Sequence, residues 1–362
     1  MPALFALLAL FTLPALFSLL ALSSLRSYGQ VREVTILRSG WKFTNARQSQ
    51  ATQLKFDDSQ WQDVTVPHDW AITGPFIPDG DGNTGKLPWK GEGWYRLNLD
   101  IPASYAGKQV YMLFDGIMSE PDIYINGKHA GSWDYGYNSF YIDITSYLKP
   151  GAKNVLAVHA DTRNHDSRWY PGAGIFRKVS MITVNPVHVA IWGTNITTPV
   201  VKPNCADVRI ASTVSNASSD SADVAVEHSI ISPEGREVAK ETVTGMLRPF
   251  ESRNFESTIT LTNPQRWNTG NGKLYAVRTI IRRENRMTDS TVTTFGIRTM
   301  RFTADHGFYL NDNRVQIKGV NLHHDLGPLG AAFSTRAMER QLELLKSMGC
   351  NAIRMSHNPP AP

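Results

Sequence analysis

The sequence has 362 residues, among them 37 Lys and Arg, 32 Asp and Glu, and two cysteines. Hydrophobic residues make up 41% and charged residues 19%, which excludes a disordered chain and predicts roughly two or three domains, each with its own core. The net charge of +5 is spread thinly and argues against a nucleic-acid partner, while two cysteines exclude a disulfide scaffold and a cysteine-based zinc site.

An apolar segment begins the chain. Residues 3–22 are almost wholly apolar, and small or polar residues follow as far as Gly29. We expect residues 1–29 to be a secretory signal peptide, because Ser27 and Gly29 supply small residues before the cleavage point. The mature protein is then exported to a periplasmic or extracellular space and has no membrane partner. The alternative is a retained anchor, because the segment is long enough to span a bilayer and no Lys or Arg precedes it.

Residues 30–186 consist of short alternating runs of apolar and polar residues, separated by turn residues. Asn126-Gly127 is a strong hairpin signal, because both positions of the tight turn need positive φ. No helical period is sustained here, so the segment is expected to form an antiparallel jelly-roll sandwich.

Residues 187–297 repeat the β pattern with more Ser, Thr and Asn. Strands are expected over 207–214, 224–231, 254–261, 274–282 and 290–295. Some seven strands in a segment of this length are typical of an immunoglobulin-like sandwich, although no Cys–Trp–Cys pattern is present.

The pattern changes in residues 298–362. A strand is expected over 314–320, a helix over 334–348 with Ser334 as its N-cap and Gly349 as its terminator, and a second strand over 351–355. Strand, helix and strand in this order predict a βαβ unit with parallel strands. A single unit cannot bury its own sheet, so it is expected to belong to a larger parallel α/β domain.

Polar residues gather where the two predicted parallel strands end. Residues 323–325 follow the first strand, residues 356–358 follow the second, and Arg354 lies near its end. The carboxyl edge of a parallel sheet is where such folds bind substrates, and His, Asn and Arg side chains suit a polyhydroxylated or anionic ligand. Two alternatives are that these residues only cap turns, or that His323, His324 and Asp325 bind a metal. The metal is the weaker reading, because adjacent histidines rarely point at one ion.

Several stretches of the sequence resemble glycoside hydrolase family 2, which contains β-galactosidases, β-mannosidases and β-glucuronidases. The resemblance rests on residues 319–330 (GVNLHHDLGPLG), 349–360 (GCNAIRMSHNPP), 67–70 (PHDW), 168–177 (RWYPGAGIFR) and 263–275. It implies a mainly β fold with a sugar-binding jelly roll over 30–186, an immunoglobulin-like sandwich over 187–297 and the truncated start of a (β/α)8 TIM-barrel catalytic domain over 298–362. Residues 323–325 and 329–332 are most similar to the β-galactosidase branch.

The resemblance also implies a site. His323, Arg354, His357 and Asn358 would help form the sugar subsite, and Asp161 would reach it from the jelly roll, with Asp166 as the alternative match. The implied activity is hydrolysis of terminal β-glycosides, most of all β-galactosides, by a retaining mechanism with two glutamates.

The sequence does not supply those two glutamates. In the family the acid/base glutamate follows an asparagine, and this chain contains no Asn-Glu dipeptide. Its last glutamates, Glu339 and Glu343, lie on the predicted helix at a spacing that suits surface ion pairs. The chain alone is therefore expected to be inactive, as a fragment of a longer enzyme. The alternative is an exported, non-catalytic carbohydrate-binding β-sandwich protein.

Seven of the nine tryptophans lie between Trp41 and Trp169. Trp70, Trp89 and Trp169 lie in segments rich in Pro and Gly and are the candidates for stacking on a sugar, whereas Trp94 and Trp133 are expected in the core. The family's galactosidases hold a Mg²⁺ or Na⁺ ion near the pocket, but this sequence contains no complete ligand set and itself requires no cofactor. It does not indicate an oligomeric state.

Overall fold

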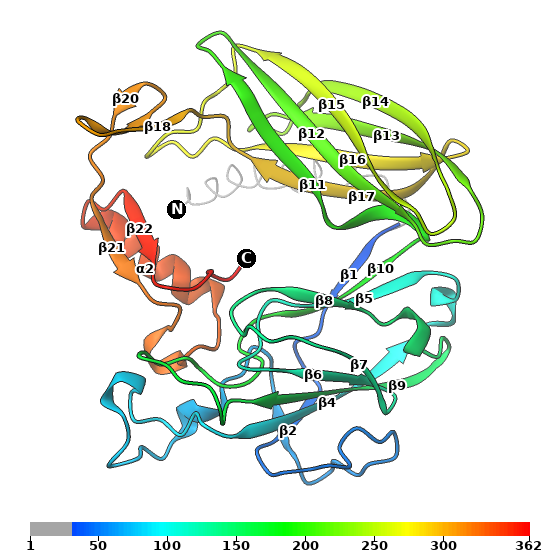
Figure 1. The fold of residues 1–362 in the computed structure, drawn as a ribbon, viewed down its shortest axis with the longest axis vertical. Helices are drawn as coiled ribbons and strands as arrows, with labels where there is room; N and C mark the ends of the chain where they lie inside the picture. The colour runs from blue at the N-terminus through cyan, green and yellow to red at the C-terminus, as the bar shows by residue number, and fades with distance from the viewer. Residues whose placement is uncertain (1–30) are drawn as a thin grey trace, which may run out of the picture. The chain divides into compact units, whose positions relative to one another are not determined.

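The computed structural model describes residues 31–362, so the expected signal peptide lies outside the described residues. Two antiparallel sheets form the first part, in the orders β1-β10-β5-β8 and β3-β2-β4-β9-β6-β7 (Figure 1). Their strands are β1 (Glu33–Ile36), β2 (Trp41–Thr44), β3 (Gln62–Val64), β4 (Glu92–Ile101), β5 (Gln109–Phe114), β6 (Asp122–Ile125), β7 (Lys128–Ser132), β8 (Phe140–Asp143), β9 (Ala152–Asp161) and β10 (Val179–Val184). Short 3-10 helices lie in the connections: η1 (Trp70–Thr73), η2 (Gly82–Thr84), η3 (Ala103–Tyr105) and η4 (Thr145–Tyr147).

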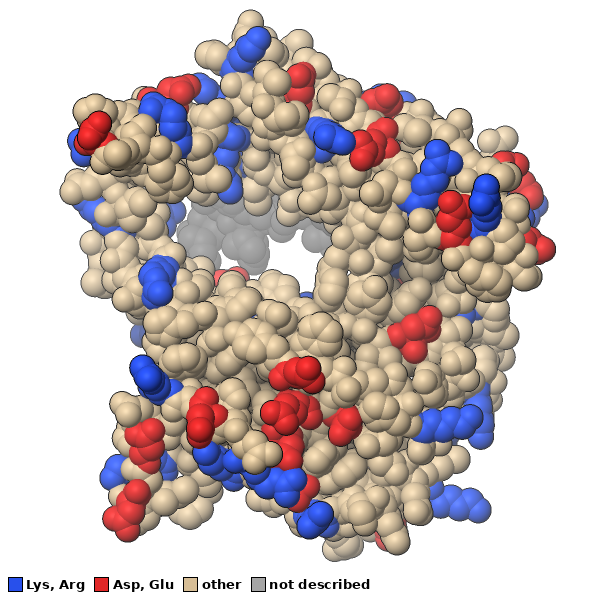
Figure 2. All heavy atoms as spheres, viewed as in Figure 1, with Lys and Arg blue, Asp and Glu red and all other residues tan. Residues whose placement is uncertain are grey.

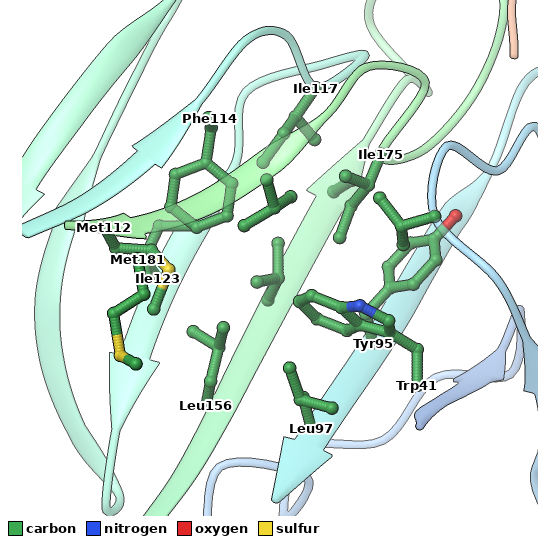
Figure 3. Packing of buried hydrophobic residues seen from close by; sticks show 14 of the residues in the cluster. Trp41, Tyr95, Leu97, Met112, Phe114, Ile117, Ile123, Leu156, Ile175 and Met181 are labelled. Carbon is green, nitrogen blue, oxygen red and sulfur yellow. The ribbon is translucent and has the colours of Figure 1, made fainter. Parts of the chain in front are cut away.

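The two sheets pack face to face around one hydrophobic core. Strand β5 alternates buried and half-buried residues, as a strand with one core face must. Its Met112 and Phe114 belong to the same buried cluster as Leu97 of β4 and Leu156 of β9 (Figure 3). Burying a side chain of this size contributes about 1.5–3 kcal/mol to the free energy of folding, so this core stabilises the sandwich that carries the loops of the site.

The predicted hairpin is confirmed. Asn126 and Gly127 connect β6 to β7 with φ of 53° and 83°, the left-handed values that this turn requires.

The second part is a sandwich of two antiparallel sheets, β11-β12-β15 and β14-β13-β16-β17. Each of the five strands predicted here has a counterpart among the longer observed strands. The bounds are β11 (Val187–Val201), β12 (Cys205–Asn216), β13 (Ala222–Ile231), β14 (Glu237–Leu247), β15 (Ser252–Thr262), β16 (Tyr275–Arg283) and β17 (Arg286–Phe295).

A polar layer divides the core of this second sandwich. Four strands each contribute one buried polar residue to it: Ser212, His228, Ser257 and Thr279. His228 Nδ1 lies 2.8 Å from Ser257 Oγ and His228 Nε2 lies 3.0 Å from Ser212 Oγ, so the ring ties the two sheets together. One apolar cluster lies on each side of the layer. Burial lowers the pKa of His228 from its ordinary value of 6.5 to about 4, so the histidine is neutral at physiological pH.

A buried ion pair joins the two sandwiches. Arg32, just before β1, places its guanidinium against both carboxylate oxygens of Asp289 in β17, at 3.0 and 2.6 Å. Asp289 is fully buried and also accepts a hydrogen bond from the backbone N–H of Val189, at 2.8 Å. A buried carboxylate is costly without such partners, so Asp289 stabilises the contact between the two β domains only while Arg32 is bound to it.

The last part contains the only α-helix of the described residues. A three-stranded sheet, β18 (Met300–Thr303), β19 (Gly307–Leu310) and β20 (Asn313–Arg314), leads into a parallel pair, β21 (Gly319–Leu322) and β22 (Ala352–Met355), connected through η5 (Gly327–Leu329) and α2 (Thr335–Ser347). The predicted βαβ unit and its N-cap are confirmed: Ser334 Oγ accepts from the N–H of Ala337. The first strand is shorter than expected, because the Asn351 side chain bonds the backbone of Gln316 and Lys318 and holds them out of a sheet.

Helix α2 exposes part of its apolar face. Met338 and Leu345 are half-buried, whereas Leu342 and Met348 on the predicted face are exposed. At 13 residues, α2 is too short to cross a membrane, and no other helix of residues 31–362 qualifies.

Basic and acidic side chains are interspersed over the face shown in Figure 2. Several acidic side chains gather in the lower part of this view, with Lys and Arg side chains beside them (Figure 2). Within the described residues, this face therefore shows no surface patch made of one sign of charge alone.

Candidate functional site

The parallel pairing of β21 and β22 brings the predicted polar residues together. Leu322 pairs with Met355 at the ends of the two strands, so the residues that follow leave the sheet side by side. The rings of His323 and His357 lie 5.4 Å apart, nearly perpendicular to each other. Arg354 donates to Ser356 Oγ at 2.8 Å, and its other terminal nitrogen lies 3.5 Å from His357 Nδ1. The sheet edge therefore brings together His323, Arg354 and His357, which we call the histidine cluster.

Trp169 reaches this cluster from the jelly roll. The ring centroid of Trp169 lies 5.8 Å from that of His323 and 5.1 Å from that of His357. Its Nε1–H donates to the hydroxyl of Tyr137 at 3.1 Å, which fixes the orientation of the half-buried indole. Of the three tryptophans proposed for sugar stacking, Trp169 is the one that contacts the histidines.

The other aromatic predictions need correction. Trp70 is only 8% exposed and stacks on Phe43 in the jelly-roll core, so it belongs to the core and not to the rim of a sugar pocket. Trp89 is buried and lines a cavity of about 340 Å³ that the histidine cluster does not line. Trp133, expected in the core, is 39% exposed and stacks on Phe140.

Asp161 ends β9 and is held by a neighbour. Arg163 forms an ion pair with it at 2.5 Å, and the hydrogen bond from this guanidinium is the main cause that lowers the pKa of Asp161. The alternative, Asp166, is exposed and pairs with Lys90 at 3.0 Å, which lowers its pKa as well. Both carboxyl groups are ionised at neutral pH, and within the described residues each pairs with a basic neighbour and not with a residue of the cluster.

Asn358 meets a residue that sequence reasoning missed. The hydroxyl of Tyr135 donates to Asn358 Oδ1 at 2.7 Å, across 223 residues of sequence. Tyr135 and Tyr137 lie in the loop between β7 and β8. The signal in the sequence is the aromatic run with glycine over residues 133–137, which does not reveal its partner.

His324 does not join the cluster. It is 7% exposed, its Nε2–H donates to the carbonyl of Pro171 at 3.1 Å, and its ring lies edge-on to Tyr137. Burial lowers its pKa to about 4. The reading of His323, His324 and Asp325 as metal ligands gains no support, because no group of three or more His, Cys, Asp or Glu within residues 31–362 is arranged to hold an ion.

A buried carboxylate fixes the start of the βαβ unit to the jelly roll. Asp69, the N-cap of η1, is 1% exposed and accepts hydrogen bonds from the Tyr170 hydroxyl at 2.8 and 2.7 Å and from the N–H of Ala331 at 2.9 Å. Burial raises the pKa of Asp69, although these hydrogen bonds oppose the shift. Gly172 and Gly330 allow the close approach: a Cβ on Gly330 would lie 2.6 Å from Asp69 Oδ2, and one on Gly172 would lie 2.3 Å from Ala331 Cβ. The motifs at residues 67–70 and 168–177 thus meet the start of the βαβ unit through Asp69, Tyr170 and Ala331. We call this contact the Asp69 joint.

Two further contacts continue this joint toward the end of the chain. The N–H of Phe333 donates to the carbonyl of Phe176 at 2.9 Å. Arg177, 2% exposed, donates to the carbonyl of Pro359 at 2.8 Å. The jelly roll therefore holds both segments that carry the histidine cluster.

Three sequence models of one family cover this architecture. "Glycosyl hydrolases family 2, sugar binding domain" matches residues 37–185, "Glycosyl hydrolases family 2" matches 188–298, and "Glycosyl hydrolases family 2, TIM barrel domain" matches 303–362. The chain belongs to glycosyl hydrolase family 2. Its βαβ unit is thus the start of the family's TIM barrel, as the resemblance implied.

Curated relatives carry two activities in their names. The β-galactosidase BoGH2A of Bacteroides ovatus is 42% identical over 334 residues, which are 91% of this chain and 39% of that protein. A β-glucuronidase of Bacteroides fragilis is 28% identical over 91% of this chain and 47% of that protein. The chain therefore spans less than half the length of these relatives.

Solved structures of the family have the same fold. A family 2 member from Bacteroides cellulosilyticus superposes with a TM-score of 0.87 at 35% identity, over 91% of this chain and 43% of that one. A Bacteroides uniformis β-glucuronidase, covalently bound to cyclophellitol-6-carboxylate aziridine, superposes with a TM-score of 0.83 at 29% identity, over 91% of this chain and 40% of that one.

Proposed function

We propose that this chain is the N-terminal part of an exported hydrolase that removes terminal β-glycosides, with β-galactosides as its preferred substrates. The observation that carries the proposal is the cluster of His323, His357 and Trp169, where two parallel strands end against a jelly-roll loop. The β-galactosidase relative at 42% identity supports the galactoside, and the 39% of its length that the chain spans supports a longer enzyme.

The cluster offers the groups that a pyranose ring needs. Arg354 and the histidines donate hydrogen bonds to hydroxyl oxygens. The face of the Trp169 indole packs against the C–H groups of the sugar. In this proposal the chain binds the glycone and excludes water from one side of it.

The catalytic carboxylates come from elsewhere in the proposed enzyme. Retaining hydrolysis uses an acid with a raised pKa and a nucleophile about 5–5.5 Å away. Glu339 and Glu343 do not fit, because both are exposed on α2 and bond Arg336, at 3.1 and 2.9 Å. This contact lowers the pKa of Glu343, the opposite of what a general acid requires. The chain alone is accordingly proposed to hydrolyse nothing.

The test uses the protein encoded by the whole reading frame, assayed with 4-nitrophenyl β-galactoside, β-glucuronide and β-mannoside. We expect turnover, fastest with the galactoside, and retention of configuration in the first product seen by NMR. His357→Ala should lower kcat/KM about ten- to hundredfold, because one or two hydrogen bonds to the sugar are lost. His306→Ala is the matched control, since His306 is an exposed histidine in the β18–β19 turn.

Two outcomes would redirect the proposal. Faster turnover of the glucuronide would move the substrate to the activity named for the Bacteroides fragilis relative. Sugar binding with no turnover by the longer protein would favour a non-catalytic carbohydrate-binding function. Export is tested separately, by locating the protein in the culture medium, the periplasm or the cytosol of its host.

A further inference from the structure

Tyr135 lies where the jelly roll meets the end of the chain. It comes from the loop between β7 and β8, is 43% exposed, and its hydroxyl donates to Asn358 Oδ1 at 2.7 Å. Its ring lies 5.6 Å from that of Tyr137, which is buried and accepts the hydrogen bond from Trp169. One anchored loop thus touches both Trp169 and Asn358.

The amide of Asn358 is satisfied on one side only. Its oxygen accepts from Tyr135, whereas its nitrogen, Nδ2, is buried and has no hydrogen-bond partner within the described residues. A buried donor without an acceptor costs about 1–3 kcal/mol, so an acceptor from a ligand gains the corresponding free energy on binding.

We propose that Tyr135 is a positioning residue of the sugar site: it holds the Asn358 amide so that Nδ2 donates to an oxygen of the glycone. The inference rests on the proposed function, because it takes the ligand of the cluster to be a sugar. It adds a jelly-roll residue to a site otherwise built from β21, β22 and Trp169. In this arrangement the loop between β7 and β8 contributes to affinity without its tyrosine having to touch the substrate.

The experiment uses the 362-residue chain with ¹⁵N-labelled asparagine and follows the side-chain amide signal of Asn358, assigned by its loss in Asn358→Asp. Tyr135→Phe removes the hydroxyl and keeps the ring. Tyr141→Phe is the matched control, because Tyr141 is exposed to the same extent, 42%, and contacts Tyr111 and Trp192 instead. The probes are methyl β-galactoside and methyl β-glucuronide.

Without sugar, we expect Tyr135→Phe to shift the Asn358 amide signal and Tyr141→Phe to leave it unchanged. With sugar, the amide signal of the unmodified chain should move at saturation, and Tyr135→Phe should weaken binding about fivefold. An Asn358 amide chemical shift that is unchanged in Tyr135→Phe would overturn the inference. A chain that binds sugar while the Asn358 signal stays still would overturn the inference alone, whereas a chain that binds no sugar would overturn it together with the proposed sugar site.

Discussion

Replacing Asp69 with Asn should loosen the Asp69 joint while leaving η1 in place. The carboxylate has two oxygens: Oδ1 accepts from the N–H of Ala71 within η1, and Oδ2 accepts from the N–H of Ala331 across the joint. The Tyr170 hydroxyl donates between them. An asparagine keeps one acceptor oxygen, so its NH₂ group must face a donor.

In the favoured orientation of the asparagine side chain, its oxygen still accepts from the N–H of Ala71 and caps η1. Its NH₂ group then faces the N–H of Ala331. The buried N–H of Ala331 then has no acceptor, at a cost of about 1–3 kcal/mol. The neutral amide is also easier to bury than the carboxylate, whose pKa is raised by burial, and this offsets part of the cost. We therefore expect local opening of residues 326–333 to become roughly 5- to 100-fold more frequent.

Hydrogen exchange followed by mass spectrometry measures this opening in peptides over residues 326–333. Asp81→Asn is the control, because Asp81 caps η2 in the same way but is exposed and contacts no other domain. Strands of the second sandwich serve as an internal reference for global unfolding. Unchanged exchange over 326–333 in Asp69→Asn, or equal acceleration in Asp81→Asn, would show that the carboxylate of Asp69 does not hold this segment.

Three further predictions concern stability. Burial lowers the pKa of His228 from 6.5 to about 4, so this histidine contributes stability above pH 6.5 that is lost as the pH falls toward 4. The buried His68 and His324 act in the same direction, so thermal unfolding should show a larger total loss between pH 7.5 and 5.0, of which His228→Gln removes about 2 kcal/mol. Arg32→Ala leaves the carboxylate of Asp289 buried without its counter-ion and should lower the free energy of unfolding by about 3–5 kcal/mol, measured in urea. Gly330→Ala places a Cβ 2.2 Å from a side chain of η1 and should disrupt the Asp69 joint, whereas Gly327→Ala, also at positive φ but with open space around it, should cost only about 1 kcal/mol.

Local signals in the sequence predicted most of the fold. The Asn126-Gly127 turn, the Ser334 cap and the alternation in β5 each depend on residues within a few positions of one another, and the structure confirms them. The approach of His323 and His357 was also predictable, because parallel strands joined through a helix must end at the same edge. In these cases chain geometry alone determines the neighbour.

The rest of the site depends on contacts between distant segments. Tyr135 and Asn358 are 223 residues apart, and Asp69 and Ala331 are 262 apart, so no periodicity connects them. Trp70 shows the same limit: its neighbours Pro67 and Gly74 suggest an exposed turn, but the ring folds back onto Phe43. The residues next to an aromatic residue in the sequence indicate the local backbone conformation. Whether its ring is buried depends on packing against distant segments, here Phe43 of β2.

The most direct test of the central claim compares two proteins under the same assay: the 362-residue chain and the protein encoded by the whole reading frame. We expect the longer protein to release 4-nitrophenol from the β-galactoside and the 362-residue chain to release none. Turnover by the 362-residue chain, or a longer protein that cleaves no β-glycoside, would contradict it.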